Sequence, residues 1–111
     1  MAGFVQIIEA RTSRAEEMMA FAREWRSGHD QMGPTRVTAC LDRDRPGTVV
    51  SIVEFASYEE AMRNSEHPET DRFSREMAAF CDEPPTFRNL DVQYQEVRMD
   101  AGARSGSLTD A

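Results

Sequence analysis

The chain has 111 residues, of which 40% are hydrophobic and 30% are charged, and its formal net charge at pH 7 is −7. This length suits a single domain, because two halves would each be too small to bury a stable core. The negative charge disfavours binding to nucleic acid or to an anionic membrane surface, and no apolar run approaches the roughly 20 residues of a membrane span.

The chain lacks the features of an export signal and of a metal site. Its first apolar segment, residues 4–8, is too short for the core of a signal peptide. We therefore expect a cytoplasmic protein. Cys40 and Cys81 fit no zinc-binding spacing, and in a cytosolic chain such residues are more often buried small side chains than a disulfide. We expect no metal centre.

Residues 4–10 predict a strand and the residues after them a helix. The strand has apolar side chains at odd and even positions, which is typical of a central strand covered on both faces. Ser13 and Glu16 have the spacing of a capping box that begins a helix. Its apolar stripe, at helical spacing, consists of Met18, Phe21, Ala22 and Trp25.

The next two elements form a predicted hairpin. Residues 35–41 alternate between apolar and polar side chains, which favours a half-buried strand near an edge of the sheet. Turn residues at 42–47 lead back antiparallel into residues 49–55. This second strand is apolar on both faces apart from Ser51 and Glu54, so we expect it to be central.

A helix interrupted at a proline follows. Ser57 and Glu60 form a second capping box, and the residue before Pro68 is pushed away from helical angles, which divides the helix in two. The buried positions of the first piece are predicted to be Tyr58, Ala61 and Met62. We expect the second piece to be capped by Thr70 or Asp71 and to bury Phe73, Met77, Phe80 and Cys81.

The end of the chain predicts one more strand and a tail. Residues 87–97 read as a strand with Leu90, Val92 and Tyr94 on one face. Residues 98–111 are small, polar and non-periodic, so they cannot offset the entropy of ordering. We therefore divide the chain into one folded domain, residues 1–97, and a disordered C-terminal tail, residues 98–111.

The element order defines the expected fold. Strand, helix, strand, strand, broken helix and strand, with right-handed crossovers, give an α+β domain of the ferredoxin-like βαββαβ type. Its four-stranded antiparallel sheet places the first and third strands in the centre. Helices cover one face of such a sheet, so the apolar residues of the other face predict a homodimer built through the sheets.

The segment after the third strand carries a family resemblance. Its loose motif consists of Phe55, Ser57, Glu59, Glu60, Ala61, Met62, Asn64, His67, Pro68 and Phe73. This segment resembles the antibiotic biosynthesis monooxygenase group of the dimeric α/β barrel superfamily, and the element order matches over the first 97 residues. The resemblance implies a sheet-to-sheet dimer, with a pocket between the helices and the sheet of each protomer.

The resemblance also implies a range of activities. Some members of the group oxidise polycyclic phenols with molecular oxygen and no cofactor, some degrade haem, and many have no known activity. The group often carries histidines where this chain has Asn64 and, nearby, Glu69. Trp25 and His67 do not map onto the Asn, Trp and His of the haem-degrading branch, which disfavours haem chemistry. We therefore expect no cofactor.

Two residues are candidates for catalysis. His67 has the chemistry of a general base at neutral pH, and Asn64 could bind the resulting oxyanion. The alternative, which the sequence favours, is that His67 and Pro68 form only a polar break between helices. The candidates for binding an apolar ligand are Trp25, Tyr58, Phe73, Met77 and Tyr94. The sequence favours core packing for Trp25 and Met77, and the two tyrosines could close a pocket or merely reach water.

Two functions follow from these features. One is a monooxygenase-like enzyme, independent of any cofactor, that acts on an apolar planar small molecule. The other is a non-catalytic dimeric module that binds a small molecule or only stabilises an assembly. A pocket lined by the candidate residues would favour the first, and a filled core with His67 in solvent would favour the second.

Overall fold

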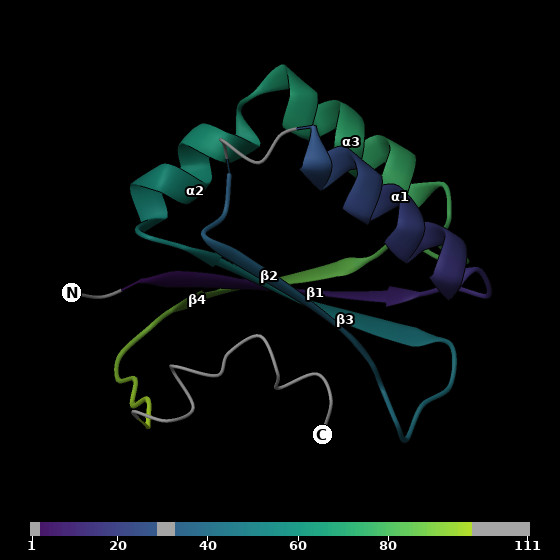
Figure 1. Ribbon diagram of the computed structural model, residues 1–111, viewed down its shortest axis with the longest axis horizontal. Coiled ribbons are helices and arrows are strands. Elements are labelled where there is room, and N and C mark those ends of the chain that lie inside the picture. The colour runs from purple at the N-terminus through teal and green to yellow at the C-terminus, as the bar shows by residue number, and fades with distance from the viewer. Residues whose placement is uncertain (1–2, 29–32, 99–111) are drawn as a thin grey trace.

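The computed structural model describes residues 3–28 and 33–98, and they form an antiparallel sheet with helices on one face (Figure 1). The elements in order are β1 (Phe4–Arg11), α1 (Ala15–Ser27), β2 (Arg36–Leu41), β3 (Thr48–Phe55), α2 (Tyr58–Ser65), α3 (Pro68–Ala78) and β4 (Thr86–Asp91). The strand order is β2-β3-β1-β4. The predicted ferredoxin-like fold, with the first and third strands in the centre, is therefore confirmed.

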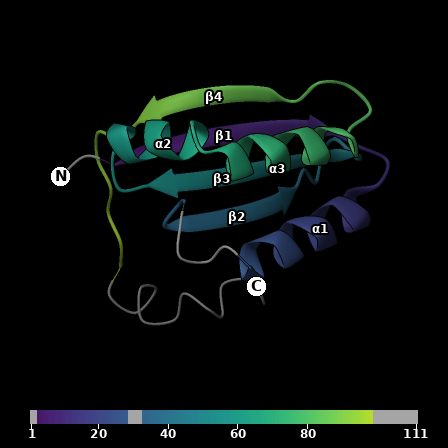
Figure 2. The same ribbon diagram turned by 90° about the horizontal axis from the view of Figure 1, so that it is seen from above.

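The three helices cover different parts of one face of the sheet. Seen from above, α2 and α3 run over the central strands β1 and β3, whereas α1 lies along the β2 side (Figure 2). No helix among the described residues is long and apolar enough to cross a membrane.

All six residues of β2 and all six of β4 are exposed, so the half-buried character expected for the second strand is wrong. β2 is an edge strand, and the helices do not cover its side chains.

The register of the central strands determines which side chains face the helices. Phe4 lies opposite Phe55, and Ala10 lies opposite Val49. All four are buried, and because side chains alternate along a strand, every second residue between them also points toward the helices. The intervening residues, Val5, Ile7, Val50 and Ile52 among them, point to the face that carries no helix.

The core is divided into two clusters at opposite ends of the central strands. Phe4 and Phe55 pack with Ala61 of α2 at one end. Ala10 and Val49 pack with Met18 of α1 at the other. The middle of the helix-facing side therefore lies between two packed regions rather than inside one.

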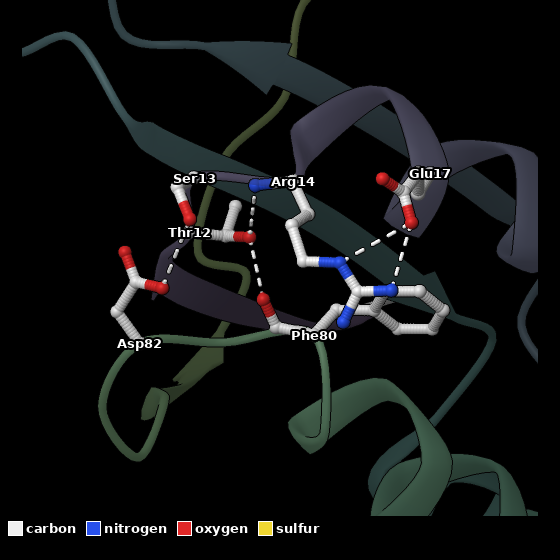
Figure 3. Close-up of polar contacts among 6 residues, drawn as sticks. All are labelled: Thr12, Ser13, Arg14, Glu17, Phe80 and Asp82. Atoms are coloured by element: carbon white, nitrogen blue, oxygen red, sulfur yellow. Dashed lines mark hydrogen bonds and ion pairs between the residues drawn. The ribbon is translucent and has the colours of Figure 1, made fainter.

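The start of α1 differs from the sequence prediction. The helix begins at Ala15, and its N-cap residue, Arg14, makes no side-chain capping bond. The buried hydroxyl of Thr12 instead accepts a hydrogen bond from the Arg14 amide at 2.9 Å and donates one to the Phe80 carbonyl at 2.6 Å (Figure 3). Ser13 donates to Asp82 at 3.3 Å, so its hydroxyl serves a long-range contact and the predicted capping box with Glu16 does not form.

The two later helices have caps of different kinds. The Ser57 hydroxyl accepts from the Glu60 amide at 3.1 Å, which confirms the predicted cap of α2. α3 begins earlier than expected, because His67 caps it with Nδ1 accepting from the Glu69 amide at 3.1 Å and Pro68 occupies the first helical position. Proline has no amide hydrogen and a suitable φ, so it starts a helix where it could not continue one.

The last strand is shorter than predicted. β4 ends at Asp91, which pairs with Phe4, the first residue of β1. Beyond this point β1 has no residue left to pair with, and one further bond joins the Val92 amide to the Gly3 carbonyl at 3.0 Å. The predicted strand over residues 92–97 is therefore wrong for this chain on its own. Residues 99–111 of the predicted tail lie outside the described residues.

Tyr58 and Cys40 are exposed, although the sequence predicts that both are buried. Tyr58 is 52% exposed, although its ring packs edge-on against Phe4 at 5.4 Å. Cys40 is exposed and Cys81 is partly buried, and both are free thiols. Cys40 lies on the edge strand β2 opposite Val50, on the face that carries no helix, which explains why it does not reach the core.

Candidate functional site

A cavity of about 200 Å³ lies between the helices and the sheet. Its floor is the middle of the two central strands, with Gln6 and Ile8 from β1 and Ser51 and Val53 from β3. This is the region between the two core clusters, where a serine and a glutamine fill less apolar volume than the phenylalanines at one end. The split of the core is therefore the structural origin of the cavity.

One face of each of two helices forms the walls. α1 contributes residues at i, i+4, i+7 and i+8, and α3 contributes residues at i, i+3, i+4, i+7 and i+8, which is the spacing of a single helical face. The α1 residues are Met18, Ala22, Trp25 and Arg26. The α3 residues are Thr70, Phe73, Ser74, Met77 and Ala78.

Aromatic contacts hold the two walls together. The Trp25 and Phe73 rings lie 4.4 Å apart, and Phe73 stacks on Phe21 at 5.8 Å. Phe21 also contacts Phe80 at 5.7 Å. Trp25 and Phe73 therefore pack against each other and border the cavity at the same time. Their role in binding a ligand stays a prediction.

One end of the cavity is polar. The Thr70 hydroxyl donates to Asn64 Oδ1 at 3.2 Å, and Arg26 Nη2 donates to the Pro34 carbonyl at 3.5 Å. Asn64 Oδ1 and Arg26 Nη1 both lie within 3.3 Å of the point that a Cβ on Gly33 would occupy. Gly33 has a φ of 88°, so this turn needs a glycine for its backbone as well as for its space.

The structure brings four of the seven candidate residues to the cavity. Trp25, Asn64, Phe73 and Met77 line it. The remaining three lie elsewhere: His67 is exposed at the start of α3, Tyr58 is exposed beside Phe4, and Tyr94 is 79% exposed with its hydroxyl donating to Glu96 at 2.8 Å. A catalytic role for His67 stays a prediction, and its observed contact is the helix cap.

Several lining residues were missed by the sequence analysis. Arg26 is not among the predicted apolar stripe of α1, but it lies at i+8 from Met18 and so belongs to the same inner face. Gln6 lies at a helix-facing position of a central strand, where its Nε2 donates to Asn89 Oδ1 at 3.0 Å. A polar residue among the apolar residues of a central strand is the signal that could have identified Gln6 as a lining residue.

Charge is unevenly distributed between the cavity and the rest of the molecule. Among the described residues that line it, Arg26 carries a charge and none is an aspartate or a glutamate. Cys81, which follows α3 in the sequence, also lines the cavity. Burial, together with the negative charge of Asp82, raises the pKa of the Cys81 thiol, so this side chain is neutral at pH 7.

The fold of this chain has counterparts among known structures. No family model matches the sequence, and comparison with curated proteins finds no match. A conserved protein from Methanosarcina mazei Go1 superposes with a TM-score of 0.72 at 7% identity, over 84% of this chain and 95% of the other. A "putative antibiotic biosynthesis monooxygenase" from Nitrosomonas europaea has a TM-score of 0.63 at 19% identity, over 86% of this chain and 94% of the other.

The chain has the fold of the antibiotic biosynthesis monooxygenase group. A further structure with this fold, described as a dimeric ferredoxin-like protein of unknown function from Jannaschia sp. CCS1, has a TM-score of 0.63 at 14% identity, over 83% of this chain and 99% of the other. The fold resemblance predicted from residues 55–73 is thus confirmed. Likeness at such identity establishes the arrangement of the elements, and function has to be argued from the site.

Proposed function

We propose that this protein binds a small apolar molecule in the cavity between its sheet and helices. The observation that supports this function is the cavity itself, lined mainly by apolar side chains with a polar end at Asn64 and Arg26. An apolar cavity of about 150 Å³ is enough to hold benzene. The volume of about 200 Å³ found here therefore suits a ligand with one or two rings.

Methyl NMR tests this proposal directly. Met18 and Met77 line the cavity, whereas Met19 does not, so their methyl resonances distinguish a ligand inside from one elsewhere. Titration with indole, naphthalene or 2-naphthol should shift the Met18 and Met77 signals and leave Met19 unchanged. Shifts at none of the lining methyls with any of these probes would contradict the proposal.

A cavity-filling variant provides the matched control. Ala22 lines the cavity, and Ala20, on the same helix, is exposed and does not. Ala22→Leu should abolish the Met18 and Met77 shifts by occupying the space, and Ala20→Leu should preserve them. Equal binding by both variants would place the probes outside the cavity.

The second candidate function is a monooxygenase that needs no cofactor and oxidises an apolar planar phenol. The descriptions of structures with this fold and the position of Asn64 at the polar end favour it. The reaction also needs a general base. No described residue that lines the cavity is a histidine, so we place ligand binding first and oxidation second.

Oxygen consumption separates the two functions. Purified protein without added metal, flavin or haem is mixed with quinols and polycyclic phenols, and oxygen uptake is recorded. If His67 is the base, His67→Asn should lower turnover by about 10²- to 10⁴-fold while preserving the helix cap. Asn64→Ala should lower it if Asn64 holds the oxyanion. No uptake by the wild type would leave the non-catalytic binding module.

We also propose that the protein is a homodimer built through the sheets. The support comes from the face that carries no helix, where the side chains of Val5, Ile7, Val50, Ile52 and Leu90 gather. Leu90 is 39% exposed, and an apolar face of this kind is typical of an interface. The Jannaschia structure with this fold is described as dimeric.

Light scattering tests the assembly. At micromolar concentration the measured mass should be twice the chain mass of 12.6 kDa. Ile7→Glu places a charge at the centre of the uncovered face and should give a monomer, and Ala20→Glu, on the exposed side of α1, should leave the mass unchanged. A wild-type protein that stays monomeric would contradict this proposal without affecting ligand binding.

A further inference from the structure

The chain carries 20 acidic residues and a net charge of −7, yet none of its aspartates or glutamates is among the described residues that line the cavity. The charged residue that does line it is Arg26. Among the described residues this wall carries one cation and no carboxylate, which is the opposite of the balance over the whole chain.

Arg26 lies in the last turn of α1, where a cation is favoured by the helix dipole in any protein. That explanation accounts for a basic residue at this position but not for the groups around it. The guanidinium reaches the polar end of the cavity, where Nη2 donates to the Pro34 carbonyl at 3.5 Å, a long bond. Its five N–H groups allow it to keep existing partners and still donate to a ligand.

The neighbours of Arg26 at this end are also donors. Asn64 Oδ1 accepts from the Thr70 hydroxyl at 3.2 Å, so the Nδ2 hydrogens are what the Asn64 amide can offer to a ligand. Ser74, one turn along α3 from Thr70, lines the same cavity. One charged and one neutral donor group at the same end of the cavity suit the two oxygens of a carboxylate.

We propose that the ligand of this cavity is a one- or two-ring monocarboxylate, held with its carboxylate at Arg26 and Asn64 and its ring against Met18, Phe73 and Met77. This assignment rests on the proposed binding function and adds the charge of the ligand. A dicarboxylate does not fit, because the far wall offers no second cation among the described residues. The volume of about 200 Å³ limits the ring system.

The test compares acids with their primary amides, which have nearly the same shape and no charge. Benzoate, phenylacetate and 2-naphthoate are each paired with benzamide, phenylacetamide and 2-naphthamide, and dissociation constants are obtained at pH 7 from the Met18 and Met77 methyl shifts. The best acid should bind about tenfold to a hundredfold more tightly than its amide, the range expected for a charge-assisted hydrogen bond.

Variants of Arg26 test the assignment of the cation. Arg26→Gln should reduce the preference for the acid to about one while the amide still binds, and this retained binding shows that the variant is folded. Arg26→Lys should keep part of the preference, because it keeps the charge and loses the planar fork. Arg23→Gln removes an exposed cation of α1 that does not line the cavity and should leave the preference intact.

Three results would overturn the inference. Equal affinities of acid and amide for the wild type would remove the charge preference while leaving small-molecule binding in place. A preference that survives Arg26→Gln would show that another group holds the carboxylate. Shifts with the neutral probes indole or naphthalene, but with none of the acids, would show that the cavity is purely apolar in its selection.

Discussion

Two buried threonines show how the position of one hydroxyl decides its contribution. Thr12 and Thr48 are both fully buried. The Thr12 hydroxyl joins the end of β1 to the segment after α3 through Phe80 (Figure 3). The Thr12 amide donates to the Gly47 carbonyl at 2.8 Å. The Thr48 hydroxyl has no hydrogen-bond partner among the described residues.

The same substitution should therefore have different effects on stability at these two positions. Thr12→Val leaves the Phe80 carbonyl and the Arg14 amide without a partner and should lower the free energy of unfolding by about 1 to 3 kcal/mol. Thr48→Val replaces an unsatisfied hydroxyl by a methyl group of the same size and should be neutral or stabilising. Urea unfolding followed by circular dichroism measures both, and equal losses would contradict the assignment.

Cys81 gives a second prediction at the scale of one residue. Its thiol pKa is raised by burial and by Asp82, so less thiolate is present at a given pH than in the unfolded chain. In a Cys40→Ser background, iodoacetamide at pH 8 should modify Cys81 more slowly than in urea, and a bound cavity ligand should slow it further. Mass spectrometry over time measures this rate. Equal rates in the folded and unfolded protein would show that Cys81 is accessible.

At the scale of elements, the break between α2 and α3 links a helix cap to the cavity. The His67 side chain caps α3, and the His67 amide donates to the Asn64 carbonyl at 3.1 Å. Asn64 is in turn bonded to Thr70 at the polar end of the cavity. The cap therefore holds the first turn of α3 in the position that places Thr70 beside Asn64.

Replacing the cap residue should separate its structural role from any chemical one. His67→Ala removes the acceptor for the Glu69 amide and should cost about 0.5 to 2 kcal/mol, whereas His67→Asn supplies another acceptor and should cost little. Thermal unfolding of the two variants measures the difference. If both lose the same stability, the hydrogen bond from the Glu69 amide contributes nothing.

At the scale of the whole molecule, the boundary of the folded domain can be tested by truncation. Residues 98–111 contain no periodic apolar face, so the chain ending at residue 97 should melt within a few degrees of the full chain, as expected when little packed area is lost. The mass from light scattering is compared in parallel. A large drop in melting temperature would mean that the segment packs on the domain or on a partner protomer.

Much of the fold follows from local features of the sequence. The apolar runs of β1 and β3, the cap at Ser57 and the break before Pro68 are short-range signals, and together they predict the element order and the central strands. Two of the differences are also local, at the starts of α1 and α3. For α3 the His67 side chain supplies the cap in place of Thr70 or Asp71, and for α1 the Thr12 hydroxyl accepts from the amide of Arg14, which itself makes no side-chain capping bond. Several residues near a helix start can make such bonds, so sequence spacing alone does not select one.

The sequence by itself determined the elements, their order and the face of each helix that carries Met18 or Phe73, since these depend on periods of two and 3.6 residues along the chain. Only the tertiary structure decided that Arg26 and Asn64 meet at one end of a cavity and that His67 and Tyr94 stay outside it. The proximity of these residues depends on how α1 and α3 cross the sheet and on where the two core clusters leave the cavity between them. Those distances are set by contacts between residues far apart in the chain, which no local pattern encodes.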